Sequence, residues 1–310
     1  MCKILSSLTF YGCFLLMESG IAYAQDPFTP TDEEVQFALR WLEQTPEASL
    51  TDEDTLFAAM LAQQHMPSLV PQFLGKELGS AEANTLRLNL AMSYCQSAAA
   101  SDFCAGHSYI EELRNSDPDN IDPYLHALVQ LADTNNYQAA YSVLVDGLKT
   151  RTTNDYYFAK LQISRRKLIA IGYPAGRINT AGEALPTIDF FTMYYRVLAI
   201  CPEQSHTSAD WKAACLTLGK RLEESGRTAL VNMIGFGLQR DVLTNNPVGQ
   251  EVVELAAVLE RRAAYVLVRD TLPLKVDGWL NPVTRPASYY DAAFEIGEMP
   301  AMKQLLESYE

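Results

Sequence analysis

The chain has 310 residues, of which 48% are hydrophobic and 20% charged, so it can bury one large or two small globular cores. Its formal net charge is −14; residues 26–54 carry nine acidic side chains and one basic one, and the last twenty residues carry five acids and one lysine. Binding to phosphates needs a basic face, so we expect no nucleic-acid partner. The one basic cluster, Arg165-Arg166-Lys167, is interpreted as the solvated side of a helix.

The first 24 residues have the features of a cleaved secretory signal. Lys3 precedes an apolar run from Ile4 to Met17, and an Ala-x-Ala site ends at Ala24, before Gln25. A membrane-spanning helix needs about 20 apolar residues, more than this run offers, so we expect no membrane span. Cys13 leaves lipid modification open as an alternative.

The mature chain has no Asn-x-Ser/Thr acceptor site, which is unexpected for a eukaryotic secreted protein of this size. The sequence therefore predicts an exported protein, with the bacterial periplasm favoured and an extracellular location as the alternative.

Helical signals follow one another along the mature chain. Thr31 and Thr51 each open a capping-box pattern, with an acidic residue three positions later, and apolar residues at helical spacing follow both. No segment alternates with period two for long enough to demand a sheet. Further helices are expected near residues 81–98, 103–115, 122–133, 137–149, 154–171, 187–200, 208–224, 227–242 and 248–269.

Residues 271–286 contain Pro273, Pro282 and Pro286, which predict a loop or extended crossing instead of a continuous helix. We therefore divide the chain into a signal (1–24), a helical repeat domain (25–270), and a proline-containing loop with C-terminal helices packed on the same domain (271–310).

The best-formed part of the helical pattern covers residues 87–152. Large and small residues recur there at a period of about 34 residues. One unit has Tyr124, Ala127, Leu128 and Leu131 on its first helix and Tyr137, Ala140 and Leu144 on its second; the unit before it has Leu90, Tyr94, Gly106, Ile110, Leu113 and Pro118 at the corresponding sites.

This pattern resembles the tetratricopeptide repeat, and residues 211–218 match its first helix again. The resemblance implies an all-α, right-handed solenoid of antiparallel helical hairpins that binds a peptide or protein segment in a concave groove; it implies no catalytic residues. An irregular multi-helix bundle is the alternative, because similar spacing occurs there too.

Four cysteines remain after the signal, in two close pairs, each expected to flank a helix-helix turn. We predict disulfides between Cys95 and Cys104 and between Cys201 and Cys215, because local pairing needs only the bend that the helices already make. Metal binding with His107 or His206 is disfavoured, since each set offers only three ligands. We therefore expect no metal and no other cofactor.

The sequence contains no linear motif of a known catalytic site. Gly235-x-Gly237 lacks the third glycine and the preceding strand of a nucleotide-binding loop, and His126 is interpreted as a partly buried polar residue. Adjacent aromatic residues on a helix point about 100° apart, so some of them should approach a groove. We select Tyr156, Tyr194 and Trp279 as candidate groove residues.

Taken together, these features predict an exported helical-repeat protein that serves as a protein- or peptide-interaction module and is not an enzyme. The alternative is a helical enzyme or small-ligand-binding protein whose site is assembled from residues scattered along the sequence. Convergent His, Asp or Glu side chains around a pocket would support that alternative. The pattern leaves the oligomeric state open.

Overall fold

The computed structural model describes residues 32–44, 50–97, 102–105, 107–174, 177–185, 190–244, 249–276 and 285–309. Over these ranges the chain is all-α, which confirms the predicted class: no β-strand occurs in them, and a single isolated bridge joins Asn120 to Thr152. The predicted signal, the Thr31 capping box and Trp279 lie outside the described residues.

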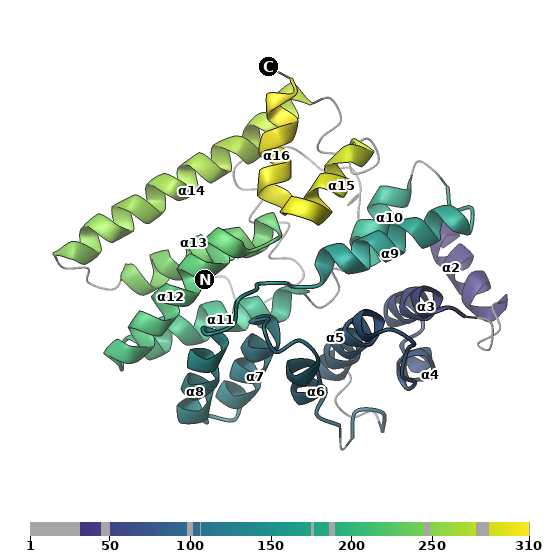
Figure 1. Cartoon of the computed structure of the whole chain (residues 1–310), viewed down its shortest axis with the longest axis horizontal. Helices are drawn as coiled ribbons and strands as arrows, with labels where there is room; N and C mark the ends of the chain where they lie inside the picture. The colour runs from purple at the N-terminus through teal and green to yellow at the C-terminus, as the bar shows by residue number, and fades with distance from the viewer. Residues whose placement is uncertain are drawn as a thin grey trace, which may run out of the picture.

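The N-terminal half forms consecutive helices that pack against their neighbours (Figure 1). The Thr51 capping box is present: Asp54 N donates to Thr51 Oγ1 at 3.2 Å, and Thr51 N donates to Asp54 Oδ2 at 3.1 Å. The elements are α2 (Asp32–Gln44), α3 (Asp52–His65), η2 (Pro67–Leu69), α4 (Val70–Leu74), α5 (Ala81–Ser97), α6 (Tyr109–Ser116), α7 (Asp122–Asp133) and α8 (Tyr137–Gly147).

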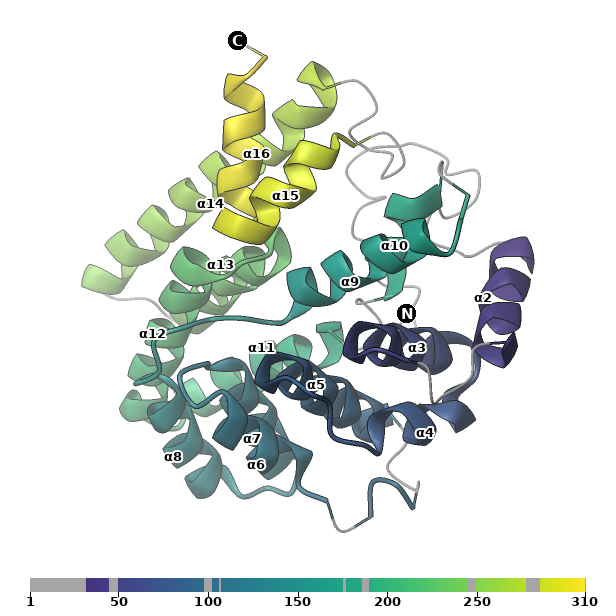
Figure 2. The ribbon, with the colours of Figure 1, turned by 45° about the vertical axis from the view of Figure 1, so that its right-hand side comes forward.

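The second half continues the helical array and returns over the first. In Figures 1 and 2, α14 lies at the outer edge, and α15 and α16 lie above α13. The elements are α9 (Tyr157–Ala170), α10 (Ile178–Ala184), α11 (Phe190–Ser205), α12 (Ala209–Ser225), α13 (Ala229–Leu243), α14 (Gln250–Lys275), α15 (Ala287–Ile296) and α16 (Glu298–Glu307).

Helix α9 lies between two parts of the core. Ile163 and Leu168 belong to a hydrophobic cluster with α3, α4 and α5, whereas Phe158 and Leu161 belong to one with α14, α15 and α16. The helix is therefore buried from two sides, and its burial joins the N-terminal helices to the C-terminal ones (Figure 2). Exposing either face of α9 would lose the free energy gained by burying several apolar side chains.

The basic cluster at residues 165–167 has defined partners. Arg166 pairs with Glu53 at 2.8 Å and Lys167 with Asp54 at 2.7 Å, both on α3, while the Arg165 guanidinium lies 4.2 Å from the centre of the Tyr290 ring. Part of the acidic N-terminal region is thus neutralised within the molecule, by the cluster interpreted from sequence as solvated.

The segment between α8 and α9 crosses the molecule without regular secondary structure. Asn120, fully buried, donates to the Asn154 carbonyl and accepts from Asn154 N, at 2.8 and 3.0 Å. The Arg221 guanidinium of α12 donates to the carbonyls of Gly147, Leu148 and Thr152. These two side chains satisfy backbone groups that no helix can satisfy, which sets the path of the chain into α9.

Two sequence expectations were wrong in detail. Helix α14 continues to Lys275 with Pro273 inside it, so the predicted loop begins later than residue 271. A proline has no amide hydrogen and clashes with the preceding turn, so position 273 cannot donate to the Arg269 carbonyl; the helix ends two residues later, at Lys275. Helices α4 and α10 were not predicted; they are short, with five and seven residues.

Hairpins α5/α6 and α7/α8 occupy the region of the repeat pattern, and Leu128, Ala140 and Leu144 are buried between helices as the pattern requires. After α8 the chain leaves this stacking, because α9 packs mainly on α3, α10 and α15. The tetratricopeptide-like solenoid remains a prediction.

Glycine allows α12 and α13 to approach each other closely. A Cβ atom on Gly235 would lie 2.3 Å from Glu223 N and 2.6 Å from Gly219 O, and one on Gly219 would lie 2.7 Å from Gln239 Cγ. Backbone atoms cannot move aside as a flexible side chain can. The Gly235-x-Gly237 sequence therefore has a packing role at its first glycine.

We expect Gly235→Ala to destabilise the protein by about 2–3 kcal/mol or more, because the new methyl group must push two helix backbones apart. Gly237→Ala on the same helix is the matched control: its Cβ would meet only Leu198 Cδ2 at 3.7 Å. Gly237→Ala should leave the free energy of unfolding unchanged or raise it by up to about 1 kcal/mol, because alanine has a higher helix propensity than glycine. Chemical denaturation of the two variants measures both effects, and equal destabilisation would refute the close-packing role.

Candidate functional site

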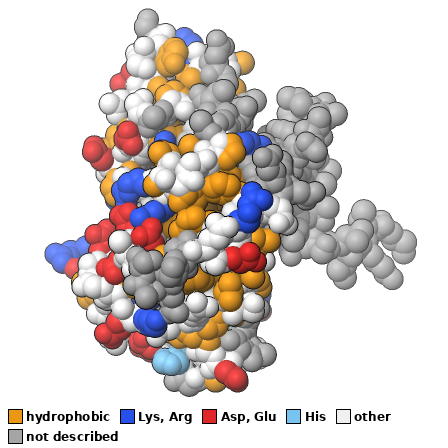
Figure 3. Space-filling view, turned by 90° about the vertical axis from the view of Figure 1, so that its right-hand side faces the viewer, with side chains coloured by type: hydrophobic (Ala, Val, Ile, Leu, Met, Phe, Trp, Pro, Cys, Tyr) orange, Lys and Arg blue, Asp and Glu red, His pale blue; other side chains and the backbone are white. Residues whose placement is uncertain are grey.

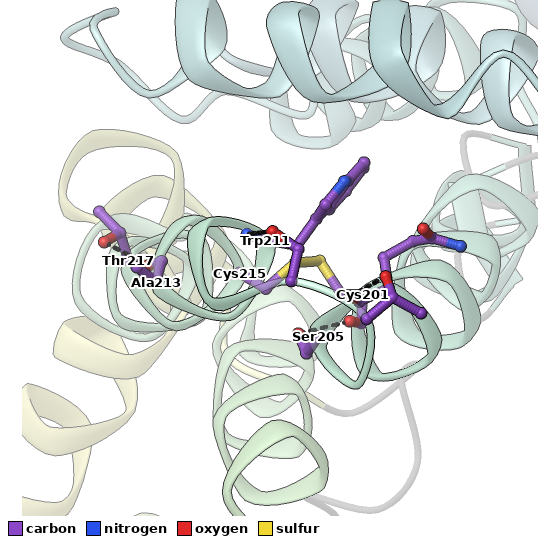
Figure 4. Close-up of a disulfide and its surroundings, with 9 residues drawn as sticks. Cys201, Ser205, Trp211, Ala213, Cys215 and Thr217 are labelled. Carbon is purple, nitrogen blue, oxygen red and sulfur yellow. Dashed lines mark hydrogen bonds between the residues drawn. A yellow bond between two sulfur atoms is a disulfide. The ribbon is translucent and has the colours of Figure 1, made fainter.

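Both predicted cysteine pairs are present as disulfides. Cys95 and Cys104 have Cα atoms 5.6 Å apart, and Cys201 and Cys215 have Cα atoms 5.7 Å apart. Figure 4 shows the second bridge joining α11 to α12, with Trp211 beside it. Each bridge closes a short local loop and holds together segments that already adjoin.

The positions of the bridges differ slightly from expectation. Cys104 lies in the turn before α6, not in its first turn, and Cys201 lies inside the last turns of α11, which continues through Pro202 to Ser205. Cys201 and Cys215 are fully buried, whereas Cys95 and Cys104 are partly exposed. The second bridge is therefore part of the core.

Because a reductant must reach a sulfur atom, we expect the Cys95–Cys104 bridge to be reduced first under native conditions and the Cys201–Cys215 bridge only on unfolding. Timed alkylation and mass spectrometry would measure this order. Loss of the second bridge in Cys201→Ala/Cys215→Ala should cost about 3 kcal/mol on the chain-entropy model. Simultaneous reduction of both bridges would contradict the difference in burial.

The histidines near the cysteines have other partners. His107 stacks on Tyr109 with ring centres 5.2 Å apart, and its Nδ1 lies 3.6 Å from a Glu112 carboxylate oxygen. In the ranges that the structure describes, no group of three or more His, Cys, Asp or Glu side chains could hold a metal ion.

Two of the predicted groove residues lie in the core. Tyr156 is 3% exposed and donates its hydroxyl to Asp117 Oδ2 at 2.7 Å; Tyr194 is 1% exposed and donates to Asp122 Oδ1 at 3.5 Å. Both rings are covered because α9 and α11 pack against neighbours on more than one side, so neither lines an open groove. The neighbouring Tyr195 is half exposed.

The partner of Tyr194, Asp122, belongs to a group of buried polar side chains that we call the polar cluster. Its members are Asn89 of α5, Asp122 and His126 of α7, Asp155 of the crossing segment and Lys160 of α9. Lys160 Nζ donates to Asn89 Oδ1 at 3.1 Å, and His126 Nε2 lies 3.6 Å from Asp122 Oδ2. The helix itself brings Asp122 and His126 together, four residues apart, but only the fold brings this pair together with Asn89, Asp155 and Lys160.

Hydrogen bonds identify the state of His126. The Gln96 side-chain amide lies 2.7 Å from His126 Nδ1 and donates to it if that nitrogen is unprotonated. The proton is then on Nε2, directed at Asp122. Burial and, to a smaller extent, the nearby Lys160 charge lower the pKa of His126 to about 3, which agrees with a neutral ring.

The pKa values of the two carboxyl groups in the polar cluster are raised, whereas that of His126 is lowered. Burial and repulsion from Asp155 raise the pKa of Asp122 to about 8. Burial raises the pKa of Asp155 to about 6, against hydrogen bonds from Tyr157 N and the Thr228 hydroxyl. The raised pKa favours the neutral carboxylic acid form of Asp122 at neutral pH.

The sequence offered only a weak signal for this cluster. His126 was noted as an isolated, partly buried residue, and its burial is confirmed. The sequence does not single out Asp122 as a site residue, because an Asp before Pro123 at a helix start is typical of helix capping. The burial of Lys160 depends on α9 lying between two core clusters, which local pattern does not reveal.

The cluster predicts an unusual pH dependence of stability. The unfolded chain releases the Asp122 proton near pH 3.8 and the folded chain near pH 8, so the contribution of Asp122 to stability falls as pH rises through this window. The contribution of His126, whose pKa is lowered, rises with pH between about 3 and 6.5. The asparagine of Asp122→Asn cannot ionise. The free energy of unfolding of this variant should exceed that of the wild type by on the order of 2 kcal/mol at pH 8 and by little at pH 4. Thermal unfolding at the two pH values measures the difference.

Asp119→Asn is the control for this experiment, because a hydrogen bond from Arg151 lowers the pKa of the exposed Asp119 instead of raising it. Asp119→Asn should therefore lose stability relative to the wild type as pH rises, where Asp122→Asn gains it. An Asp122→Asn gain that does not depend on pH would contradict the protonated state of Asp122.

The most exposed apolar surface is on α14. Nine large hydrophobic side chains in the described ranges are exposed, and five of them lie on this helix. At helical spacing they and two exposed alanines form what we call the outer stripe: Val252, Ala256, Leu259, Ala263, Leu267 and Leu274, with Val253 at its edge. Apolar residues on the solvent side of an amphipathic helix are unusual for a helix that packs only inward.

The inner side of α14 is packed in the ordinary way. Val258, Tyr265 and Leu272, spaced seven residues apart, are buried, and the Tyr265 hydroxyl donates to the Ala229 carbonyl at 2.7 Å. At about 100° per residue this face lies opposite the outer stripe. Among the described helices, α13 and α16 pack most closely on α14, and Figure 1 shows it at the edge of the array.

Hydrophobic side chains also reach the surface on the side of the molecule that bears α2, α3 and α10, where Lys, Arg, Asp and Glu are interspersed with them (Figure 3). A mixed surface of this kind is normal, because more than half of a protein surface is contributed by apolar atoms. The outer stripe differs because its apolar residues follow one another along one helix face from Val252 to Leu267 and resume at Leu274 after Asp270. We therefore take it as the candidate interaction site.

Comparison of the chain with protein-family models, with curated proteins and with solved structures gave no significant match. A functional assignment for this chain therefore depends on its own residues. Within the described ranges, no helix is both long and apolar enough to cross a membrane.

Proposed function

We propose that this is an exported helical-repeat protein that acts by binding another polypeptide chain through the outer stripe of α14, with no chemistry of its own. The observation that carries the proposal is the exposure of Leu267 and Leu274, 67% and 85%, on a helix whose opposite face is buried. Contiguous exposed apolar side chains rimmed by charge are typical of protein interaction sites.

The helix is held firmly, as a binding element should be. Arg261 Nε pairs with Glu223 of α12 at 2.6 Å, and Lys212 of α12 pairs with Glu251 near the start of α14. With Tyr265 bonded to α13, these contacts fix the helix at its start and in its middle. Little conformational entropy would then be lost from α14 on binding.

Export is supported by two features. Disulfides persist in oxidising compartments, and both cysteine pairs are joined. The N-terminal 24 residues have the pattern of a secretory signal. We propose the bacterial periplasm as the location, with the extracellular space as the alternative.

A photo-crosslinking residue in place of Leu267 tests the binding role in the native compartment. We expect it to link the protein covalently to a polypeptide, because the side chain would lie inside the contact; intact mass should show the exported chain beginning at Gln25. The same residue in place of Ile169 on α9, 60% exposed, is the matched control and should give no discrete product. Identical patterns at the two positions would refute a site on α14.

A further inference from the structure

The outer stripe is nearly symmetric about Ala263. Leu259 and Leu267 lie four residues before and after it, and Val252 and Leu274 lie eleven residues before and after it. A polypeptide face that binds an unrelated partner has no need of such symmetry. A face that binds its own copy does need it, because two-fold pairing brings each residue opposite the one at the equal and opposite offset.

In an antiparallel pair of α14 helices crossing at Ala263, Leu259 of each copy meets Leu267 of the other, and Val252 meets Leu274. Ala263 at the crossing point has a small side chain, which lets the two helix axes approach. Ala264 next to it is also small and exposed. Leu259 and Leu267 therefore match in size and position, and Val252 and Leu274 match in position.

The charges on α14 have the same antiparallel order. Residues before position 261 carry only acids, whereas the bases come at or after it, with Asp270 as the exception; the acids are Glu251, Glu254 and Glu260 and the bases are Arg261, Arg262, Arg269 and Lys275. Glu251, Arg261 and Arg269 already pair within their own copy, with Lys212, Glu223 and Asp270. An antiparallel partner places its other bases, Arg262 and Lys275, along the half of the first copy that carries Glu254 and Glu260. A parallel partner would place like charges together, which is unfavourable.

Asp270 is the one charged residue within the stripe. It lies seven residues after Ala263, and in the antiparallel pair it falls opposite Ala256, seven residues before. The alanine methyl group leaves room for water around the carboxylate, and Arg269 Nε already donates to Asp270 Oδ1 at 2.9 Å. Its charge can therefore stay hydrated and paired.

We propose that the polypeptide bound by the outer stripe is a second copy of this chain, docked antiparallel through α14 about a two-fold axis at Ala263. This inference rests on the proposed binding role of the stripe. The contact of one helix with one helix is at the small end of specific interfaces, so the dimer forms reversibly and its population depends on concentration.

Sedimentation of the disulfide-bonded mature chain over a concentration series tests the association. The wild type should shift from monomer to dimer as concentration rises, and Leu267→Asp should remain monomeric because it buries a charge against Leu259 of the partner. Ile169→Asp places the same charge on a similarly exposed residue away from α14 and should associate as the wild type does. Circular dichroism of both variants checks that they are folded.

Engineered cysteines test the orientation. Ala263→Cys should form a disulfide with its own copy at the axis. Val252→Cys should not link to itself but should link to Leu274→Cys when the two variants are mixed. Self-linking of Val252→Cys would indicate parallel pairing and overturn the antiparallel arrangement.

A chain that stays monomeric at every concentration overturns the second-copy inference. If a residue at 267 then still crosslinks to a different polypeptide in the native compartment, the proposed function stands and only its partner is wrong. A dimer that Leu267→Asp does not weaken overturns the inference in another way, since the contact then lies elsewhere on the molecule.

Discussion

The path of residues 148–156 is the constraint on which the arrangement of the other helices depends. A segment without regular structure cannot satisfy its own backbone groups, and part of this one is buried. Asn120 and Arg221 satisfy those groups from two sides, one from the start of α7 and the other from α12. With the segment held, Tyr156 adopts a left-handed conformation at φ 58° and the chain turns into α9.

The position of α9 explains the polar cluster. A helix buried from two sides carries a lysine into the interior, where Lys160 donates to Asn89 and its charge acts on Asp122 and Asp155. The hydrogen-bonded partners reduce the cost of burying these groups, and the protonated Asp122 reduces it further, because a neutral carboxyl group is cheaper to bury than a carboxylate. The cluster ties α5 and α7 to α9 and the helices that follow it.

The two faces of α14 show how one helix can serve two contacts. Its inner face, with Val258, Tyr265 and Leu272, completes the core over α13 and α16. Its outer face is apolar without being needed for that core. Association through the outer stripe would add burial at the edge of the array without rearranging any contact inside it, which suits a reversible assembly.

The sequence by itself determined the all-α class, the two disulfides and the capping box at Thr51, because helical periodicity, local cysteine spacing and capping are all encoded over a few residues. It also located the helix hairpins between residues 81 and 147, although α4 and α10 are too short for periodicity to reveal. Tyr156 and Tyr194 were assigned to a groove because local pattern gives the direction of a side chain but not what covers it.

Only the tertiary structure decided which residues meet. The polar cluster combines residues from position 89 to position 160, and the close contact of Gly219 with Gly235 depends on how α12 and α13 cross. The outer stripe of α14 could be recognised as exposed only when the opposite face was seen to be buried. Burial and proximity arise from contacts between distant parts of the chain, and a single sequence contains no local signal for them.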